Sequence, residues 1–340
     1  MRGAFLVYLV PACAVLVGLA CSTAGTGAPP PAASATEAAA AAESSTIAAQ
    51  SATASPSATP APTASAVTAL ASAAPEPAEK PPCPPSMTLV GRFCIDTYEA
   101  ELEVQTPDGS WAPHPHWERP PEGKTFRAVN AAGAFPQGYI SQKESAAACK
   151  ESGKRLCTKG EWQRACKGKG WMRYPYGSQA IKGKCNSSKQ HLLSIMFKNP
   201  PKGMTYEIFN APELNKEPGW LSKSGEYPDC ASELGVFDMV GNLHEWVSDK
   251  VTDQLIDDME AEKVERHKQP HAVGNGVFMG GFYSTTSELG PGCLYITVAH
   301  EPSYHDYSTG FRCCAAADLP KPPPKAPKPG VKPGASASSR

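Results

Sequence analysis

Two adjacent cysteines end the run TGFRCC at residues 309–314, and such a pair can do several kinds of chemistry. It can ligate a metal, act as a redox couple, or supply one half each to two separate disulfides. Successive side chains of an extended strand point to opposite faces. On a strand, Cys313 and Cys314 would therefore face apart, and each would need its own partner.

The other cysteines favour structural disulfides over thiol chemistry. The chain of 340 residues contains 12 cysteines, and ten of these lie between residues 83 and 318. An even number behind an export signal is typical of a disulfide framework. No CxxC pair occurs and no histidine stands at zinc-ligand spacing from paired cysteines, which argues against a metal–thiolate site.

Short elements are expected to position these cysteines. The runs SQKESAAACKESG (141–153) and TKGEWQRACKG (158–168) each begin with a capping box and end at glycine, so they predict two helices that present Cys149 and Cys166. Strands are expected within 86–104 and in short runs between 275 and 316. The run CPPSMTLVGRFC turns at Gly91 and predicts a hairpin. Residues 168–234 look irregular, and the charged stretch 253–268 is expected to be a solvated, partly helical insertion.

The chain outside this region has the composition of targeting and tether segments. Residues 1–21 form an apolar export signal that is too short for a stable membrane span. Its end, GLAC, resembles a lipoprotein cleavage box and would make Cys21 the lipidated first residue of the mature protein. Gly18 replaces the usual leucine, so ordinary secretion stays open. Residues 22–82, rich in Ala, Ser, Thr and Pro, and the Pro/Lys-rich tail 319–340 are expected to be disordered.

Residues 83–318 are then expected to form one globular domain. The formal net charge of -1 shows no excess of basic residues of the kind that nucleic-acid-binding proteins have. A lipid on Cys21 would tether the domain to a membrane surface without spanning it. The expected location is extracytoplasmic, in a bacterial cell envelope (periplasm or outer membrane), or outside the cell if Cys21 carries no lipid.

Four blocks in order carry a family resemblance: FCIDTYEA (93–100), GKRLCTKGEWQRACKG (153–168), GVFDMVGNLHEWVSD (235–249), and the Gly-Gly to GFRC stretch (280–313). Together they resemble the formylglycine-generating enzyme (sulfatase-modifying factor) family over nearly all of 83–318. The resemblance implies an α+β fold, irregular and loop-rich, related to C-type lectins and held by several disulfides.

The resemblance also implies where catalytic cysteines should stand. Active members bind copper with two cysteines that follow the Gly-Gly turn, and they oxidise a sulfatase cysteine to formylglycine. Those positions fall here at Thr285 and near Gly290, and neither is cysteine. The family serine after the glycines is replaced by Phe282, and an aromatic position of the third block by His244. Thr and Gly supply no thiolate for a soft copper site, so copper is not expected.

The family disulfides match positions in this chain. The resemblance implies Cys149–Cys313 and Cys166–Cys293. Local closure then suggests Cys83–Cys94 and Cys185–Cys230, which leaves Cys157–Cys314.

A family calcium site also carries over to the block DMVGNLHEW. Its ligands would be the side chains of Asp238 and Glu245 and the backbone carbonyls of Gly241 and Leu243, oxygen donors of the kind that calcium prefers. The alternative is a tight loop with solvated or capping carboxylates. A second family calcium site would begin at Asn186, with no matching aspartate downstream.

These observations leave two hypotheses for function. The preferred one is an exported, lipid-anchored, non-catalytic module, stabilised by disulfides and calcium, that binds a protein or glycan partner. The alternative is an oxidoreductase of the same family with altered metal ligands, acting on a peptide or small molecule. Iron held by His300, Glu301 and His305 would be its cofactor.

Overall fold

The computed structural model describes residues 81–198, 203–262, 270–285 and 290–320. The expected export signal and Cys21, together with nearly all of the expected linker and tail, lie outside these residues. Within the described part of the chain, no helix combines the length and the apolar composition that a membrane span requires.

The start and the end of the domain pair with each other in one sheet. Its strand order is β1-β2-β11-β6, formed by Met87–Val90, Phe93–Asp96, Cys313–Ala316 and Arg155–Leu156. The hairpin β1–β2 turns at Gly91, whose φ of 62° lies in the left-handed region that glycine adopts without strain. The predicted hairpin is confirmed, and β11 places Cys313 and Cys314 on a strand.

Two further sheets complete the framework. A four-stranded sheet has the order β10-β7-β8-β9, formed by Thr309–Phe311, His244–Lys250, Gly276–Met279 and Ile296–Thr297. The β10–β7 pair is parallel and the others are antiparallel. A three-stranded antiparallel sheet has the order β4-β3-β5, formed by Trp111–Pro113, Glu101–Gln105 and Phe126–Val129.

The two predicted helices are present with their capping boxes. Helix α1 (Gln142–Glu151) is capped by Ser141, and α2 (Lys159–Lys167) is capped by Thr158. In each, the cap hydroxyl accepts the backbone N–H of a glutamate three residues on, and that carboxylate accepts the backbone N–H of the cap. Both helices bury the face that carries their cysteine.

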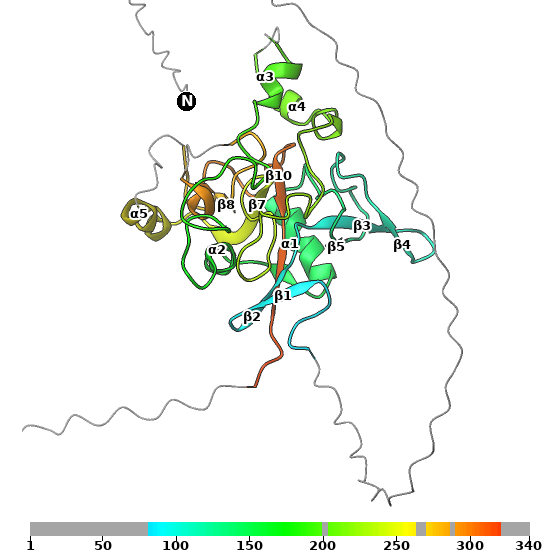
Figure 1. Cartoon of the computed structure of the whole chain (residues 1–340). Helices are drawn as coiled ribbons and strands as arrows, with labels where there is room; N and C mark the ends of the chain where they lie inside the picture. Colours follow the sequence, from blue (N-terminus) through cyan, green and yellow to red (C-terminus); the bar gives the residue numbers. More distant parts are fainter. Residues whose placement is uncertain (1–80, 199–202, 263–269, 286–289, 321–340) are drawn as a thin grey trace, which may run out of the picture. The chain divides into compact units, whose positions relative to one another are not determined.

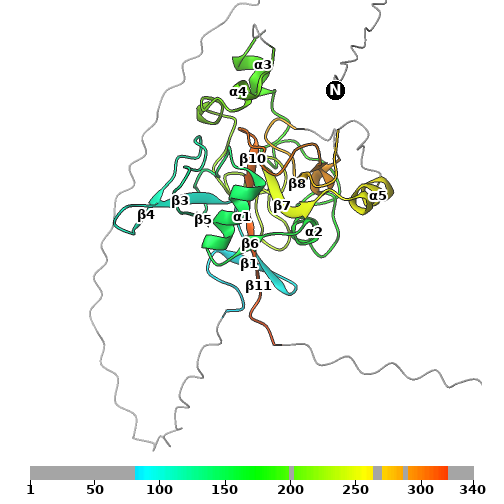
Figure 2. The same cartoon turned by 180° about the vertical axis from the view of Figure 1, so that it is seen from behind.

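The remaining helical segments are short. They are α3 (Leu192–Met196), α4 (Tyr206–Phe209), the 3-10 turns η1 (Leu214–Lys216) and η3 (Gly292–Leu294), and α5 (Asp253–Ala261). Figures 1 and 2 show α3 and α4 at one end of the domain and the β1–β2 hairpin at the other. The expected α+β, loop-rich architecture is confirmed. Helix α5 is not a purely solvated insertion, because Leu255 and Met259 are buried in the main hydrophobic cluster.

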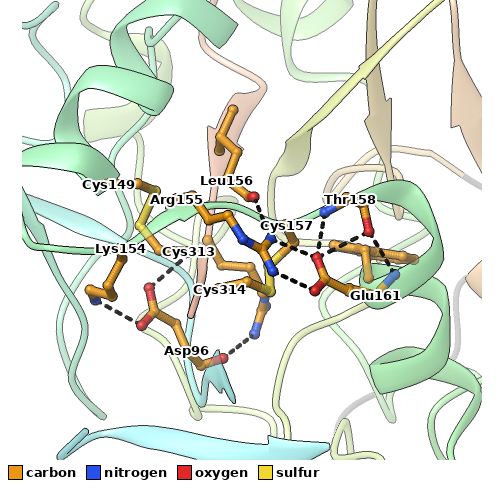
Figure 3. Close-up of a disulfide and its surroundings, with 12 residues drawn as sticks. Asp96, Cys149, Lys154, Arg155, Leu156, Cys157, Thr158, Glu161, Cys313 and Cys314 are labelled. Atoms are coloured by element: carbon orange, nitrogen blue, oxygen red, sulfur yellow. Dashed lines mark hydrogen bonds and ion pairs between the residues drawn. A yellow bond between two sulfur atoms is a disulfide. The ribbon is translucent and has the colours of Figure 1, made fainter. Parts of the chain in front are cut away.

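Five disulfides hold the described residues together, and they are the five pairs expected from the sequence: Cys83–Cys94, Cys149–Cys313, Cys157–Cys314, Cys166–Cys293 and Cys185–Cys230. Figure 3 shows the two bridges of β11 leaving the strand on opposite sides, one to α1 and one to the segment between β6 and α2. Each bridge restricts the unfolded chain, which suits a domain with little regular hydrogen-bonded ladder.

A buried ion pair supports the same junction. The carboxylate of Asp96 is fully buried at the end of β2. Its Oδ1 pairs with Lys154 Nζ at 2.8 Å, and its Oδ2 accepts the backbone N–H of Cys313 at 2.9 Å. Burial raises the pKa of Asp96, and Lys154 opposes that rise. The strand that carries both cysteines is thus anchored to the Asp96 carboxylate of β2 by a hydrogen bond as well as by strand pairing, and the ion pair with Lys154 holds that carboxylate in place.

Candidate functional site

The Gly-Gly turn after β8 is closed by a threonine. Gly280 and Gly281 have φ values of 84° and 75°, where side chains are strained. A Cβ on Gly280 would lie 2.8 Å from the carbonyl oxygen of Met239, so the backbone needs glycine there. Thr285 Oγ1 accepts the N–H of Phe282 and donates to its carbonyl, both at 2.8 Å. Thr285 therefore holds the turn in shape.

The second position matched to a copper cysteine is also structural. Gly290 has a φ of 112°, and a Cβ there would lie 2.6 Å from the carbonyl oxygen of Leu294. The nearby Cys293 has no free thiol, because it forms a disulfide with Cys166. Every cysteine of the described residues is in a disulfide, so this part of the chain offers no thiolate.

An aromatic pocket lies beside the Gly-Gly turn. This cavity of about 430 Å³ has ring walls from β8, from the segments after β8 and before β9, and from the loop 300–308: Phe278, Phe282, Tyr295, Tyr304 and Tyr307. Three histidines also line it: His191, His244 and His300. A concave, mainly apolar cavity with a few polar groups is the usual form of a small-molecule site.

Two histidines of the aromatic pocket, His244 and His300, are held as uncharged rings. His244 packs between Phe278 and Phe282, with ring centroids 4.7 and 5.0 Å away. Burial lowers the pKa of His244 to about 3, with a further contribution from His300. Burial likewise lowers the pKa of His300 to about 4. Both rings are therefore neutral at physiological pH.

Among the described residues, one acidic side chain lines the pocket, and it already has its hydrogen-bond partners. Asp306 Oδ2 accepts the Tyr304 hydroxyl at 2.5 Å, and Oδ1 accepts the Ser308 N–H and hydroxyl at 2.9 and 2.8 Å. Burial raises the pKa of Asp306, and these hydrogen bonds oppose the rise. The carboxyl group thus shapes the loop 304–308.

The two carboxylates of the predicted calcium site, Asp238 and Glu245, lie in a buried acidic cluster. Glu245 pairs bidentately with Arg312, whose Nε and Nη2 donate to Oε2 and Oε1, each at 2.6 Å. Asp238 Oδ2 accepts the N–H of Gly225 at 2.7 Å. A third carboxylate, Glu99, accepts hydrogen bonds from the Asn242 side chain and the Leu243 N–H.

Charge at this cluster favours a cation. Burial raises the pKa of Glu99 well above its usual value, and Asp238 and Glu245 raise it further. Burial also raises the pKa of Asp238 to about 6. In the described part of the chain, no three His, Cys, Asp or Glu side chains are grouped to hold a metal by themselves. The oxygen donors suit calcium, but an ion would need backbone carbonyls and would share Glu245 with Arg312.

The residues expected for a second calcium site and for an iron site make other interactions. Asn186 donates to the carbonyl of Trp220 and to Asn242 Oδ1, both at 2.8 Å, so it locks the loop before β7. His300 stacks on Tyr304 at 3.8 Å, and His305 Nδ1 lies 2.7 Å from Asn210 Oδ1. Glu301 is exposed. His300, Glu301 and His305 therefore do not converge as the iron alternative requires.

Comparison with protein-family models assigns most of this chain to a known family. The model of the sulfatase-modifying factor enzyme 1-like domain matches residues 83–317. The chain belongs to this family. The resemblance inferred from the four sequence blocks is confirmed.

Two bacterial members of the family are similar over part of their length. The formylglycine-generating enzyme of Mycobacterium tuberculosis is 27% identical over 168 residues, which is 49% of this chain and 48% of that protein. The formylglycine-generating enzyme of Streptomyces coelicolor is 26% identical over 216 residues, 60% of this chain and 59% of that protein. The match therefore spans about half to three-fifths of the length of these relatives.

Solved structures show only a weak likeness. PvdO from Pseudomonas aeruginosa has a TM-score of 0.37 at 16% identity, covering 66% of this chain and 80% of that one. Treponema denticola variable protein 1 has a TM-score of 0.38 at 13% identity, covering 68% and 98%. At these scores the likeness adds nothing to the family assignment.

The sequence alone does not identify all residues of the acidic cluster and of the aromatic pocket. Glu99 and Arg312 stand inside the diagnostic blocks FCIDTYEA and GFRC, yet neither was assigned a role. The aromatic pocket was also missed, because its walls come from separate segments without a common spacing. Its nearest signal was His244 in place of an aromatic residue.

Proposed function

We propose that this chain is an exported, lipid-anchored member of the sulfatase-modifying factor family that binds a partner and does not form formylglycine. One observation supports this above all: the two positions matched to copper cysteines are turn residues, Thr285 and Gly290. The ten cysteines of the domain are bonded to one another. A copper(I) site needs soft thiolate ligands, and this domain has none to offer.

The scaffold suits a binding module in an oxidising compartment. Five disulfides and a buried ion pair hold the loops, and such density of bridges is typical of exported domains. The lipid on Cys21 would fix the chain to a membrane surface of the bacterial cell envelope. The partner is a protein or glycan, and calcium held by Asp238, Gly241, Leu243 and Glu245 would stiffen the loop before β7.

The test is an assay of chemistry on the disulfide-intact chain. The purified protein is loaded with copper(I), and oxygen uptake is followed with a cysteine-containing sulfatase peptide, beside an active formylglycine-generating enzyme as positive control. We expect no stoichiometric copper, no oxygen uptake and no free thiol in the denatured, unreduced domain. Copper or iron retained at one ion per chain together with oxygen uptake would overturn the proposal in favour of an oxidoreductase.

A further inference from the structure

An exposed turn follows helix α2. Residues 169–173, the run KGWMR, are all exposed, and Trp171 and Met172 keep exposures of 64% and 40%. We call residues 167–173 the basic turn. Single exposed apolar side chains are common on protein surfaces, so their exposure alone gives this turn no role.

The backbone of Trp171 is strained. Its φ is 53°, in the left-handed region where a bulky residue is an outlier. Glycine or asparagine would adopt this conformation with less strain. Because the indole is mostly exposed, its packing contributes little to folding and does not explain a tryptophan here. A strained residue without a packing reason points to a function.

The basic turn and the end of α2 carry an excess of positive charge. Residues 162–173 contain no acidic residue and four basic ones: Arg164, Lys167, Lys169 and Arg173. Two carboxylates of other segments act on this stretch. Glu233 accepts the N–H of Gly170 at 2.9 Å, and Glu262 raises the pKa of Lys167 against the larger, opposite effect of burial. Four cations against two carboxylates leave a net positive charge.

Both ends of the basic turn are tied to Cys293. The residue before the turn, Cys166, forms a disulfide with Cys293. At the other end, the Cys293 N–H donates to the carbonyl of Arg173 at 2.8 Å. The turn is therefore a fixed projection of the domain.

The indole of Trp171 lies among cations. Its ring centroid is 5.1 Å from Arg164 Cζ and 5.8 Å from Lys167 Nζ, distances at which a cation is attracted to the ring. An aromatic ring and basic side chains are thus presented together to solvent.

We propose that the basic turn contacts the anionic surface of the membrane to which the lipid on Cys21 would tether the chain. Trp171 would enter the headgroup region, where tryptophan is enriched in membrane proteins. Lys169 and Arg173 would meet the lipid phosphates, because an anionic leaflet attracts basic side chains. A lipid chain and a basic patch are two signals that together stabilise attachment to a membrane.

A protein partner matches the basic turn less well. Tryptophan, methionine and arginine are also enriched in protein interfaces. A specific interface, however, buries about 800 Å² on each partner. The turn offers two consecutive large apolar side chains, Trp171 and Met172, between basic residues. A charged bilayer surface needs no wider apolar area than this.

The inference goes beyond partner binding, and it rests on the proposed lipid attachment for the choice of membrane. Binding to vesicles is measured on a chain without lipid, so a failure there would remove the membrane contact and leave the copper and oxygen assay unaffected. Oxygen uptake with stoichiometric copper would overturn the non-catalytic role and leave the membrane contact standing.

The protein for this test is the disulfide-intact chain 22–340, which retains every described residue and lacks the apolar export signal. Its sedimentation is followed with vesicles of phosphatidylglycerol and phosphatidylethanolamine in equal amounts, and with vesicles of phosphatidylcholine alone. We expect at least about tenfold tighter binding to the anionic vesicles, since each basic residue near such a surface is worth about fivefold. Equal affinity for both kinds of vesicle, or no binding to either, would overturn the inference.

The tail 319–340 also contains lysines, so variants of the turn decide where the contact lies. Trp171→Asn removes the ring and suits the left-handed backbone. It should weaken binding to the anionic vesicles about tenfold, the effect of no longer burying an apolar side chain. Brominated phosphatidylglycerol should quench less tryptophan fluorescence in this variant than in the wild type.

The matched control for the ring is Met204→Asn. Met204 is 46% exposed and precedes α4, which Figures 1 and 2 show away from α2. This variant should bind and be quenched as the wild type is. Wild-type binding and quenching in Trp171→Asn would overturn the contact and leave the exposed ring for a protein partner.

The charges are tested by Lys169→Gln and Arg173→Gln. Each should weaken binding to the anionic vesicles about fivefold at low salt, and the difference from the wild type should disappear at high salt. Lys124→Gln is the control, an exposed lysine just before β5 on another side of the domain. It should bind as the wild type does. Equal losses in Lys124→Gln and in the two variants of the turn would overturn a contact at the basic turn.

Discussion

Arg312 and Glu245 form a bidentate ion pair at the centre of the domain, with two N···O distances of 2.6 Å and exposures of 0% and 1%. Arg312 also donates to the backbone carbonyls of Asp96 and Phe237 at 3.1 and 2.9 Å. The guanidinium thus ties β7 to β2 and to the loop before β7. Its positive charge balances the negative charge of the carboxylates in the acidic cluster.

Removing this guanidinium should be strongly destabilising. Arg312→Met leaves Glu245 buried without its counter-charge, with Glu99 and Asp238 close by. Breaking a buried pair from one side costs about 3–5 kcal/mol. Urea unfolding of the purified variant measures this loss of free energy of unfolding.

An exposed pair provides the matched control. Arg155 pairs with Glu161 at 2.6 Å, and the Arg155 side chain is 48% exposed. Solvent screens such a pair, so Arg155→Met should cost less than about 1 kcal/mol. Similar losses of free energy of unfolding in both variants would show that the buried Arg312–Glu245 pair matters no more to stability than an exposed pair.

Adjacent disulfides should share their stabilising effect. Cys149–Cys313 and Cys157–Cys314 span 164 and 157 positions. When the first bridge is present, the second closes a ring of only about ten residues, which is worth about 3 kcal/mol in the chain-entropy model. Its separation in sequence therefore overstates its contribution.

The bridge Cys185–Cys230 spans only 45 positions but has no such neighbour. It should contribute about 4 kcal/mol, more than Cys157–Cys314 despite its shorter span. The comparison uses paired Cys→Ala variants and urea unfolding. Removing Cys149–Cys313 first should raise the contribution of Cys157–Cys314 to about 4 kcal/mol, because the bridge Cys166–Cys293 then limits its ring to about 30 residues. A larger loss for Cys157–Cys314 in the intact background would contradict the shared-ring argument.

Local chemistry made part of this fold predictable. The capping boxes at Ser141 and Thr158 lie within one helical turn, so the sequence contains all their partners. The opposite directions of Cys313 and Cys314 follow from strand geometry alone. Which cysteines they meet is a long-range matter: the family resemblance supplied the partner of Cys313, and that of Cys314 was left after the other cysteines were paired.

The acidic cluster and the aromatic pocket could not be predicted from the sequence, for a different reason. Glu99 meets Asn242 across 143 positions, and His244, Phe278 and His300 come from three separate segments. No periodicity links such residues. Tertiary packing also overrode the charged composition of 253–268, since Leu255 and Met259 found a buried surface.

His300 should make stability sensitive to acid. Its pKa is lowered by burial to about 4, below the value of about 6.5 in an unfolded chain. The unfolded state therefore takes up the proton first, so the stabilising effect is complete above pH 6.5 and is lost as the pH falls toward 4. The loss should be about 1 kcal/mol per pH unit across this window.

The measurement compares the wild type with His300→Phe, which keeps a ring for stacking on Tyr304. Free energies of unfolding at pH 7, 6 and 5 should fall more steeply in the wild type than in the variant. Carboxyl groups titrate in both proteins and cancel in the difference. The exposed His271→Phe is the control and should follow the wild type. Parallel curves for His300→Phe and the wild type would remove His300 as the cause.

Calcium should stabilise this domain through Asp238. We expect calcium to raise the melting temperature of the wild type and a chelator to reverse the rise, because an ion bound only by the folded state shifts the unfolding equilibrium.

Asp238 has a φ of 57°, so Asp238→Ala strains the backbone whether or not calcium binds. The informative quantity is therefore the difference in melting temperature with and without calcium, which should vanish in Asp238→Ala. Asp238→Asn tolerates the same backbone and keeps one oxygen donor, so it should retain a reduced response. An unchanged melting temperature of the wild type with chelator would remove calcium from the cluster and leave Arg312 as its counter-charge.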